Sequence, residues 1–333
     1  MAELHYAPYH LLQGTPNIVV DGAPGPDTVL TLSHWPGAPT PEELRADTST
    51  EIVLNYLRAP DRERYGTATA VTNNHVDHDG LAGIWALLHP EQALEQADLL
   101  AAVATAGDFN YVPEEQELAA KVVVALNTLL DPESGPFAAE VANLPPEERT
   151  ARLHQAVLPI FGELLSDIDA YWEHWFADYT DVLRARHLVG SGAVQVEERP
   201  ELDLSIIQTP LRLDPLVLYS LSRMPRMLVV LAENTYVFEY RYESWVQFQS
   251  RRVQPRIHLG GLATRLNMFE RREGRWTFED LRSMTPRLFL RGPDGEPAPS
   301  SIAAETVVAE VTEFLRAHAA DRQLQWSPYT DEP

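Results

Sequence analysis

The chain has 333 residues, 44% of them hydrophobic, which is enough for two domains and a large core. It contains no cysteine, so disulfides, thiolate nucleophiles and cysteine-ligated zinc are excluded. Its net charge of −23 argues against long nucleic acids and anionic membranes as partners, because proteins bind the phosphates of both through Lys and Arg.

Positive charge is concentrated in one region of the chain. Residues 212–292 hold 14 Arg against 8 Asp or Glu, whereas residues 1–211 hold 10 Lys or Arg against 33 acids. No apolar run reaches the length of a membrane span. Residues 1–5 lack the basic and apolar regions of a secretory signal. We therefore expect a cytoplasmic protein with an arginine-rich C-terminal part.

Two short strands are predicted near the N-terminus, and each ends in a side chain that can bind a metal. Residues 17–22 read as a strand that ends in a turn at Asp21, and residues 28–36 read as a second strand that ends at His34. A helix with a capping-box pattern is predicted over residues 46–57. Taken singly, Asp21 and His34 are explained as turn residues.

The central stretch of the sequence joins a strand to a helix through a polar loop. Residues 67–72 are a β-branched and alanine run typical of a buried strand, and residues 81–88 have helical periodicity. Between them His75, Asp77 and Asp79 occupy alternate positions at the carboxyl end of the strand, where open α/β sheets bind ligands. The carboxylate oxygens of the two aspartates favour magnesium or manganese. A solvated turn explains the same stretch equally well.

Helical patterns dominate the middle of the chain. Residues 90–106 form a helix that is followed by Asp108, and residues 149–188 form a long helix or pair of helices whose aromatic positions fit a core or a homodimer interface. The C-terminal part mixes strands, such as residues 227–231, with a last helix over residues 302–318. The predicted fold class is α/β. We expect an N-terminal parallel-sheet α/β domain over residues 1–135, a helical connector over residues 136–192 and a smaller C-terminal α+β domain over residues 193–325.

Taken together, the polar residues resemble the motifs of the DHH phosphoesterase superfamily. Residues 73–80 resemble its first motif, in which two aspartates are separated by one residue and are followed by glycine and a helix. Asp21 is similar to its second motif, His34 to the middle histidine of its third, and Asp108 to its fourth. Residues 47–51 resemble the Ser-Thr-x-Glu helix that follows the third motif.

The resemblance departs from the superfamily pattern in several ways. The second and third motifs precede the first, as in a circularly permuted domain, which compact folds tolerate. Asn73 stands where the superfamily has a histidine, for which His75 can substitute, and Ser33 and Trp35 replace the outer two residues of the third motif. Residues 250–263 weakly resemble the DHH-associated substrate domain but lack the histidine after its paired glycines.

The resemblance implies a hydrolase in which two manganese or magnesium ions activate water against a phosphorylated substrate in an interdomain cleft. The substrate is small or short, such as a nucleotide or a short oligonucleotide. The implied metal ligands are Asp21, His34, His75, Asp77, Asp79 and Asp108. The implied catalytic groups are Asp79, His78 and His75, and the implied substrate-binding residues are Asn73, Arg251, Arg252 and Arg256.

The same residues also fit three different roles. The three arginines fit an exposed, solvated strand as well as a phosphate clamp. The altered third motif fits a non-catalytic relative that binds a phosphorylated ligand or a protein partner. Three histidines, His34, His75 and His78, also fit a zinc hydrolase of an unrelated α/β fold.

Overall fold

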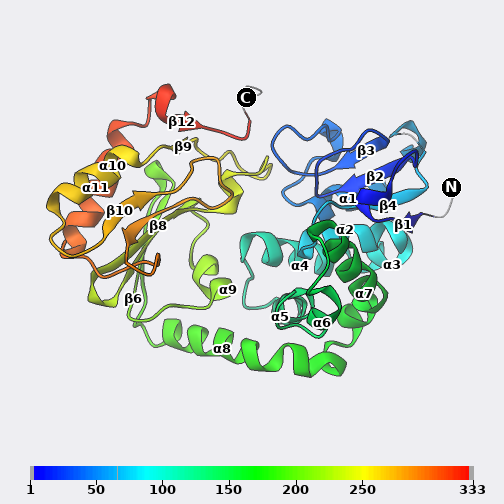
Figure 1. Cartoon of the computed structure of the whole chain (residues 1–333), viewed down its shortest axis with the longest axis horizontal. Coiled ribbons are helices and arrows are strands. Elements are labelled where there is room, and N and C mark those ends of the chain that lie inside the picture. Colours follow the sequence, from blue (N-terminus) through cyan, green and yellow to red (C-terminus); the bar gives the residue numbers. More distant parts are fainter. Residues whose placement is uncertain (1–3, 66, 330–333) are drawn as a thin grey trace. The chain divides into compact units, whose positions relative to one another are not determined.

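The computed structural model describes residues 4–65 and 67–329, and it confirms the α/β fold class (Figure 1). The chain divides into two compact units. The first comprises the residues up to Val182 together with Phe248–Ser250, and the second comprises Leu183–Gln247 and the residues from Arg251 onward. Within the described residues, no helix combines the length and hydrophobicity that crossing a membrane requires.

The sheet of the first unit is parallel throughout. Its four strands, in spatial order, are β1 (His5–Tyr6), β4 (Ala70–Thr72), β2 (Asn17–Val20) and β3 (Thr28–Leu32). β2 and β4 are completely buried, as expected of apolar strands that are covered on both faces. Parallel pairing requires the loop 21–27 to run back along the length of β2 before β3 begins. The loop is long enough for this because β2 has only four residues. All four carboxyl ends therefore meet at one edge.

The helices of the first unit follow the predicted pattern with one interruption. They are α1 (Ser49–Arg58), α2 (His78–Leu88), α3 (Pro90–Glu95), α4 (Ala97–Phe109), α5 (Glu117–Leu130), α6 (Ala138–Val141) and α7 (Pro146–Ser166). The helix predicted over residues 90–106 is divided into α3 and α4. α1 begins after a capping box, in which the Thr48 side chain accepts from the backbone N–H of Glu51 and the Glu51 side chain accepts from the backbone N–H of Thr48. α2 packs closely on β2, because a Cβ on Gly83 would lie 2.6 Å from Val20 Cγ1.

The predicted helical connector is not a separate part of the structure. α7 buries the apolar side chains Leu153, Val157 and Phe161 and packs against α5 in the first unit. After η4 (Ile168–His174), the boundary between the units falls inside α8 (Phe176–Gly190). The unit boundary differs from the predicted limits because the apolar face of α7 belongs to the core of the first unit.

A short segment from the C-terminal half of the chain completes the first unit. The Phe248 ring makes an edge contact with the Phe109 ring, with 5.4 Å between the centroids. The backbone N–H groups of Gln249 and Ser250 both donate to Asp47 Oδ1, at 2.6 and 2.7 Å. The first unit therefore depends on residues that are remote in sequence.

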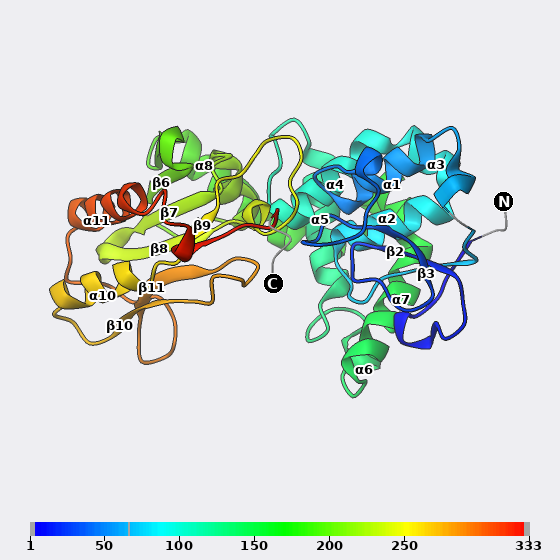
Figure 2. The same ribbon diagram turned by 90° about the horizontal axis from the view of Figure 1, so that it is seen from above.

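The second unit is built on a mixed six-stranded sheet. Its strands, in spatial order, are β10 (Arg275–Phe278), β11 (Arg287–Arg291), β8 (Thr235–Tyr240), β7 (Arg226–Leu231), β6 (Leu204–Thr209) and β5 (Gln195–Arg199), with β6 and β7 as the parallel pair. α10 (Gly260–Phe269) and α11 (Ala304–Ala317) lie beside this sheet and share its apolar core (Figure 2). This arrangement agrees with the predicted α+β domain.

Smaller elements complete both units. The second unit also contains α9 (Pro215–Leu218) and the antiparallel pair β9 (Arg256–Ile257) and β12 (Gln325–Trp326). Short 3-10 helices lie at Tyr9–Leu11, Glu42–Leu44, Arg62–Tyr65, Pro200–Leu202, Tyr219–Leu221, Ala232–Asn234, Tyr242–Ser244 and Arg322–Leu324.

Arg256 has a structural role, which corrects its predicted contact with substrate phosphate. Its side chain is fully buried in the second unit. Its guanidinium donates to the Ser244 hydroxyl and to the backbone carbonyl groups of Arg241, Leu281, Ser283 and Met284. A guanidinium has five N–H groups, and these bonds use all of them. Arg256 therefore has no donor left for a substrate.

We expect Arg256→Met to lower the free energy of unfolding of the second unit by about 3 kcal/mol or more, because buried carbonyl groups lose their donors. The neighbouring Arg252 is exposed, so Arg252→Met should change that free energy by less than about 0.5 kcal/mol. Denaturant unfolding followed by circular dichroism measures both variants. Equal stabilities for the two would contradict the structural role of Arg256.

Candidate metal centre

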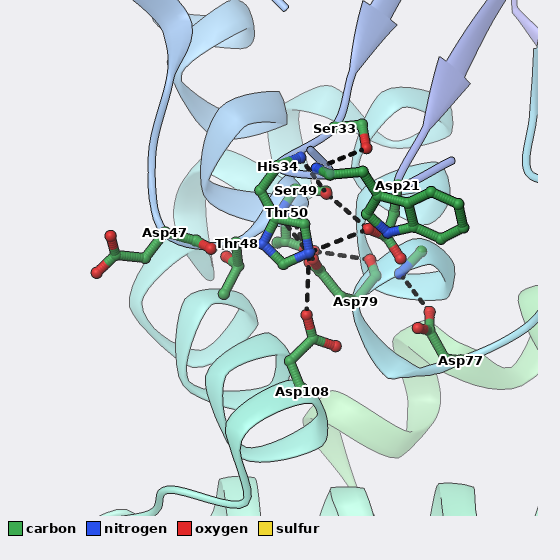
Figure 3. A network of polar contacts seen from close by, with 12 residues as sticks. Asp21, Ser33, His34, Asp47, Thr48, Ser49, Thr50, Asp77, Asp79 and Asp108 are labelled. Carbon is green, nitrogen blue, oxygen red and sulfur yellow. Dashed lines mark hydrogen bonds and ion pairs between the residues drawn. The ribbon is translucent and has the colours of Figure 1, made fainter. Parts of the chain in front are cut away.

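The six predicted metal ligands converge at the carboxyl edge of the parallel sheet (Figure 3). Three strands and two helices supply them: Asp21 after β2, His34 after β3, His75 and Asp77 after β4, Asp79 in the first turn of α2, and Asp108 near the end of α4. This edge is where open α/β sheets place their ligands, because the loops there can be polar without disturbing the core.

Three of these side chains form a buried set, which we call the inner group: Asp21, His34 and Asp79. His34 Nε2 lies 3.3 Å from Asp21 Oδ1 and 3.9 Å from Asp79 Oδ2. Asp108 Oδ2 also lies 3.3 Å from the same nitrogen. One ligand atom from each member of the inner group lies within 4.8 Å of the others, so a single cation can reach all three.

A second set, the outer group, consists of Asp21, His75 and Asp77. His75 Nε2 lies 3.3 Å from Asp21 Oδ2 and 3.0 Å from Asp77 Oδ2. The side chains of His75 and Asp77 are 33% and 31% exposed, whereas those of the inner group are at most 1% exposed. The outer group is therefore the side of the centre that solvent reaches.

Asp21 belongs to both groups. Its Oδ1 faces His34 and its Oδ2 faces His75, so one carboxylate directs one oxygen to each set. Asp21 follows β2 in the left-handed conformation, with φ 47°, which aspartate tolerates better than most residues. Gly22 follows it, and a Cβ there would clash with the side chain of Asn74. The turn after β2 thus places a carboxylate between two imidazoles.

The first turn of α1 supports the inner group through hydrogen bonds. The backbone N–H groups of Ser49 and Thr50 donate to the two carboxylate oxygens of Asp79, at 2.6 and 2.7 Å. The His34 ring is held from its other side, because Nδ1 lies 2.6 Å from the backbone oxygen of Asp47. A hydrogen bond of this kind fixes the tautomer of a histidine ligand and directs Nε2 at the metal.

Charge within the centre shifts the pKa of both histidines upward. Burial alone would lower the pKa of His34, but the hydrogen bond and charge of Asp21 and the charge of Asp79 outweigh it and raise the pKa to about 9. Burial is likewise outweighed at His75, where Asp77 and Asp21 raise the pKa to about 11. The metal-free protein therefore holds two imidazolium ions among its carboxylates.

The pKa values of two carboxyl groups, Asp79 and Asp21, shift in opposite directions. Burial and the charge of Asp21 raise the pKa of Asp79 to about 7, although His34 opposes the shift. At Asp21, hydrogen bonds from His34 and His75 overcome burial and hold the pKa far below its usual range. Asp21 is consequently ionised at neutral pH, and an ionised carboxylate can serve as a ligand shared by two cations.

The donor atoms of both groups fit hard divalent cations. Each group combines carboxylate oxygens with one imidazole nitrogen, a set that suits manganese or magnesium better than copper or a thiophilic metal. The imidazolium protons lie where cations would bind, and they supply the positive charge that the buried acids require. Cation binding would exchange these protons for metal charge.

His78 lies outside both groups, although the sequence makes it a candidate catalytic residue. Its ring packs against α4, where a Cβ on Gly107 would clash with it. Burial lowers its pKa, although polar groups of Val123 and Asn127 on α5 oppose the shift. His78 therefore packs between helices, and its predicted catalytic role is replaced by a structural one.

Asn73 supports a ligand, which corrects its predicted contact with substrate. Its side chain is fully buried beside Gly22 and Gly80, either of which would clash with it if it carried a Cβ. Asn73 Oδ1 accepts a hydrogen bond of 3.2 Å from the backbone N–H of His75. Asn73 thus holds the loop that positions His75.

The remaining predicted substrate residues, Arg251 and Arg252, lie in the second unit. Arg251 donates to the backbone oxygen of Arg223, and Arg252 is exposed. Sequence reasoning missed the contacts of Ser49 and Thr50, although the capping pattern at residues 46–57 marks the helix start from which they arise.

The chain belongs to a family of unknown function, DUF6687, whose model matches residues 2–326. No curated protein sequence and no solved structure matches it. The family assignment thus covers both units but carries no activity with it.

In metal-free protein at pH 7.5, we expect His34 and His75 to be protonated and His154 to be neutral, because burial lowers the pKa of His154 to about 4. The interactions that raise these two pKa values stabilise the folded state, and their contribution is fully present below pH 6.5. The contribution of His34 is lost as the pH rises through about 9. Nitrogen-detected NMR of the imidazole rings measures each state. Neutral His34 and His75 at pH 7.5 would refute the assignment.

Proposed function

We propose that this protein is a metal-dependent hydrolase of phosphate esters or anhydrides that binds two manganese or magnesium ions. The observation that carries the proposal is the position of Asp21, whose two carboxylate oxygens face two separate Asp/His groups. A carboxylate shared between two cation sites is the arrangement found in two-metal hydrolases. The resemblance of the motifs to DHH phosphoesterases supports the same activity.

The residues of the centre would hold the two cations in two separate sites. Asp21, His34, Asp79 and Asp108 would hold the inner cation, and Asp21, His75 and Asp77 the outer one. Two bound cations supply positive charge for a phosphoryl group and lower the pKa of water. Substrate would approach the exposed outer group, because the inner group is closed to solvent.

The proposed substrate is small and phosphorylated. A net charge of −23 disfavours the long polyanions that bind to extended basic surfaces. A short nucleotide or another compact phosphate compound needs only the local charge of two cations. The cytoplasmic location and the homodimer stay predictions, and the largely exposed Trp172 and Phe176 leave an apolar surface for the latter.

A non-catalytic, ligand-binding relative is a second candidate function. Trp35 favours it, because this residue replaces the last histidine of the third motif and packs on a ligand, with 5.2 Å between the Trp35 and His75 ring centroids. An indole N–H can donate a hydrogen bond to a phosphate, but an indole does not exchange a proton near neutral pH as an imidazole does. Cation binding without hydrolysis of any phosphate compound would favour this candidate.

The metal sites can be tested by elemental analysis of protein purified after manganese supplementation. We expect about two manganese ions per chain in the wild type, about one in Asp77→Asn and none in Asp21→Asn, because Asp21 serves both groups. Asp98→Asn removes an exposed acid in the first turn of α4 and should retain two. A wild type without manganese would overturn the proposal.

Activity is tested on the same proteins with a panel of phosphate monoesters, diesters and pyrophosphate. The wild type and Asp98→Asn should hydrolyse one class, and Asp21→Asn should lose more than about 100-fold in kcat/KM, since even groups that only support metal ligands account for 10- to 100-fold. Full activity of Asp21→Asn would remove the metal centre from the reaction.

Metal affinity should rise with pH. Between about pH 7 and 9, binding at the inner group displaces one proton, from His34, so the apparent affinity should increase about tenfold per pH unit. Below about pH 7, where Asp79 is also protonated, the dependence should be steeper. Calorimetry with manganese in buffers of different ionisation enthalpy measures the number of protons released. An affinity that is constant from pH 6.5 to 8.5, with no proton release, would contradict imidazolium at the centre.

A further inference from the structure

Ser49, the first residue of α1, contacts every member of the inner group. Its hydroxyl donates to Asp21 Oδ1 at 2.8 Å and accepts from the backbone N–H of His34 at 3.3 Å. Its own backbone N–H donates to Asp79 Oδ2 at 2.6 Å (Figure 3). Ser49 is fully buried, so water does not compete for these bonds. One residue thus joins three ligands that come from β2, β3 and α2.

The start of α1 also carries a cap in which no metal ligand takes part. Thr48 caps α1 by accepting from the backbone N–H of Glu51, and Glu51 in turn accepts from the backbone N–H of Thr48. The N–H groups of the first helical turn have no partner inside a helix, and Asp79 accepts those of Ser49 and Thr50. The first turn of α1 therefore presents two backbone donors to Asp79 of the inner group.

The outer group has a different kind of support. Asn73 holds His75 through its backbone, and Asp77 is the N-cap of α2, where its Oδ1 accepts from the backbone N–H of Gly80. Both ligands come from one loop after β4, and both are about one-third exposed. The inner group is thus held from α1, which contributes no ligand, whereas the outer group is held by its own loop and by the helix that directly follows it.

We infer that Ser49 is a positioning residue that sets the geometry of the inner cation site and makes it the tighter of the two sites. This inference rests on the proposed metal centre. The Ser49 hydroxyl holds Asp21 Oδ1 toward His34 while leaving that oxygen a lone pair for a cation. A centre built in this way binds two cations of one kind in two steps, with the inner site filled first.

Titration with cobalt, whose visible absorption reports ligand geometry, tests this role. In the wild type we expect two binding steps of different affinity. In Ser49→Ala, the tighter step should weaken by 10- to 100-fold and its spectrum should change, as is usual when a residue that orients metal ligands is removed. The weaker step should change by less than about threefold, because Ser49 bonds to Oδ1 of Asp21, whereas the outer group uses Oδ2 of Asp21 together with His75 and Asp77.

The matched control is Thr48→Ala. This variant removes the cap of the same helix without removing a contact to any ligand, so it reproduces a loss of helix stability alone. Both cobalt steps and both spectra should match the wild type. Asp77→Asn, which keeps an N-cap for α2, should abolish the weaker step and so assign the tighter step to the inner group.

The outcomes separate the inference from the proposed function. Wild-type affinity and spectrum in Ser49→Ala would overturn the inference and leave the metal centre intact. Equal weakening in Thr48→Ala would also overturn it, since general loss of helix structure would then explain the effect. A wild type that binds no cobalt and no manganese would overturn both.

Discussion

The first unit depends on one constraint: a carboxylate, Asp21, must remain ionised although it is buried. A buried charge is costly unless it is paired, and His34 and His75 pair with it from two directions. Both histidines therefore lie beside the end of the same strand, and each also lies close to further acids. The parallel order of β2, β3 and β4 satisfies this constraint, because it brings three loops to the carboxylate.

The acids of the centre outnumber the histidines, and this imbalance explains its electrostatics. Four carboxylates lie within the reach of two imidazoles, so protonation of Asp79 near neutral pH relieves part of the repulsion. Divalent cations would relieve it more completely and would let all four acids ionise. The shape of the site and its charge therefore point to the same kind of ligand.

The sequence was sufficient to predict the α/β class, because strand and helix periodicities are local patterns, and the resemblance to DHH phosphoesterases named the six side chains that the structure brings together. It could not place the supporting residues. Asn73 and His78 carry the polar groups of catalytic residues, and their burial follows from packing on Gly22, Gly80 and Gly107. Arg256 was misread for a similar reason, because an arginine whose donors are all bound within the protein has the same sequence signature as one that faces solvent.

The segment Phe248–Ser250 has a consequence for the evolution of the chain. Because these residues pack in the first unit while the residues on both sides of them belong to the second, no single cut separates the two units. A gene fragment that ends at Val182 would leave Asp47 without the two backbone donors it accepts. The units are therefore not interchangeable modules, and recombination or domain shuffling would have to transfer them together.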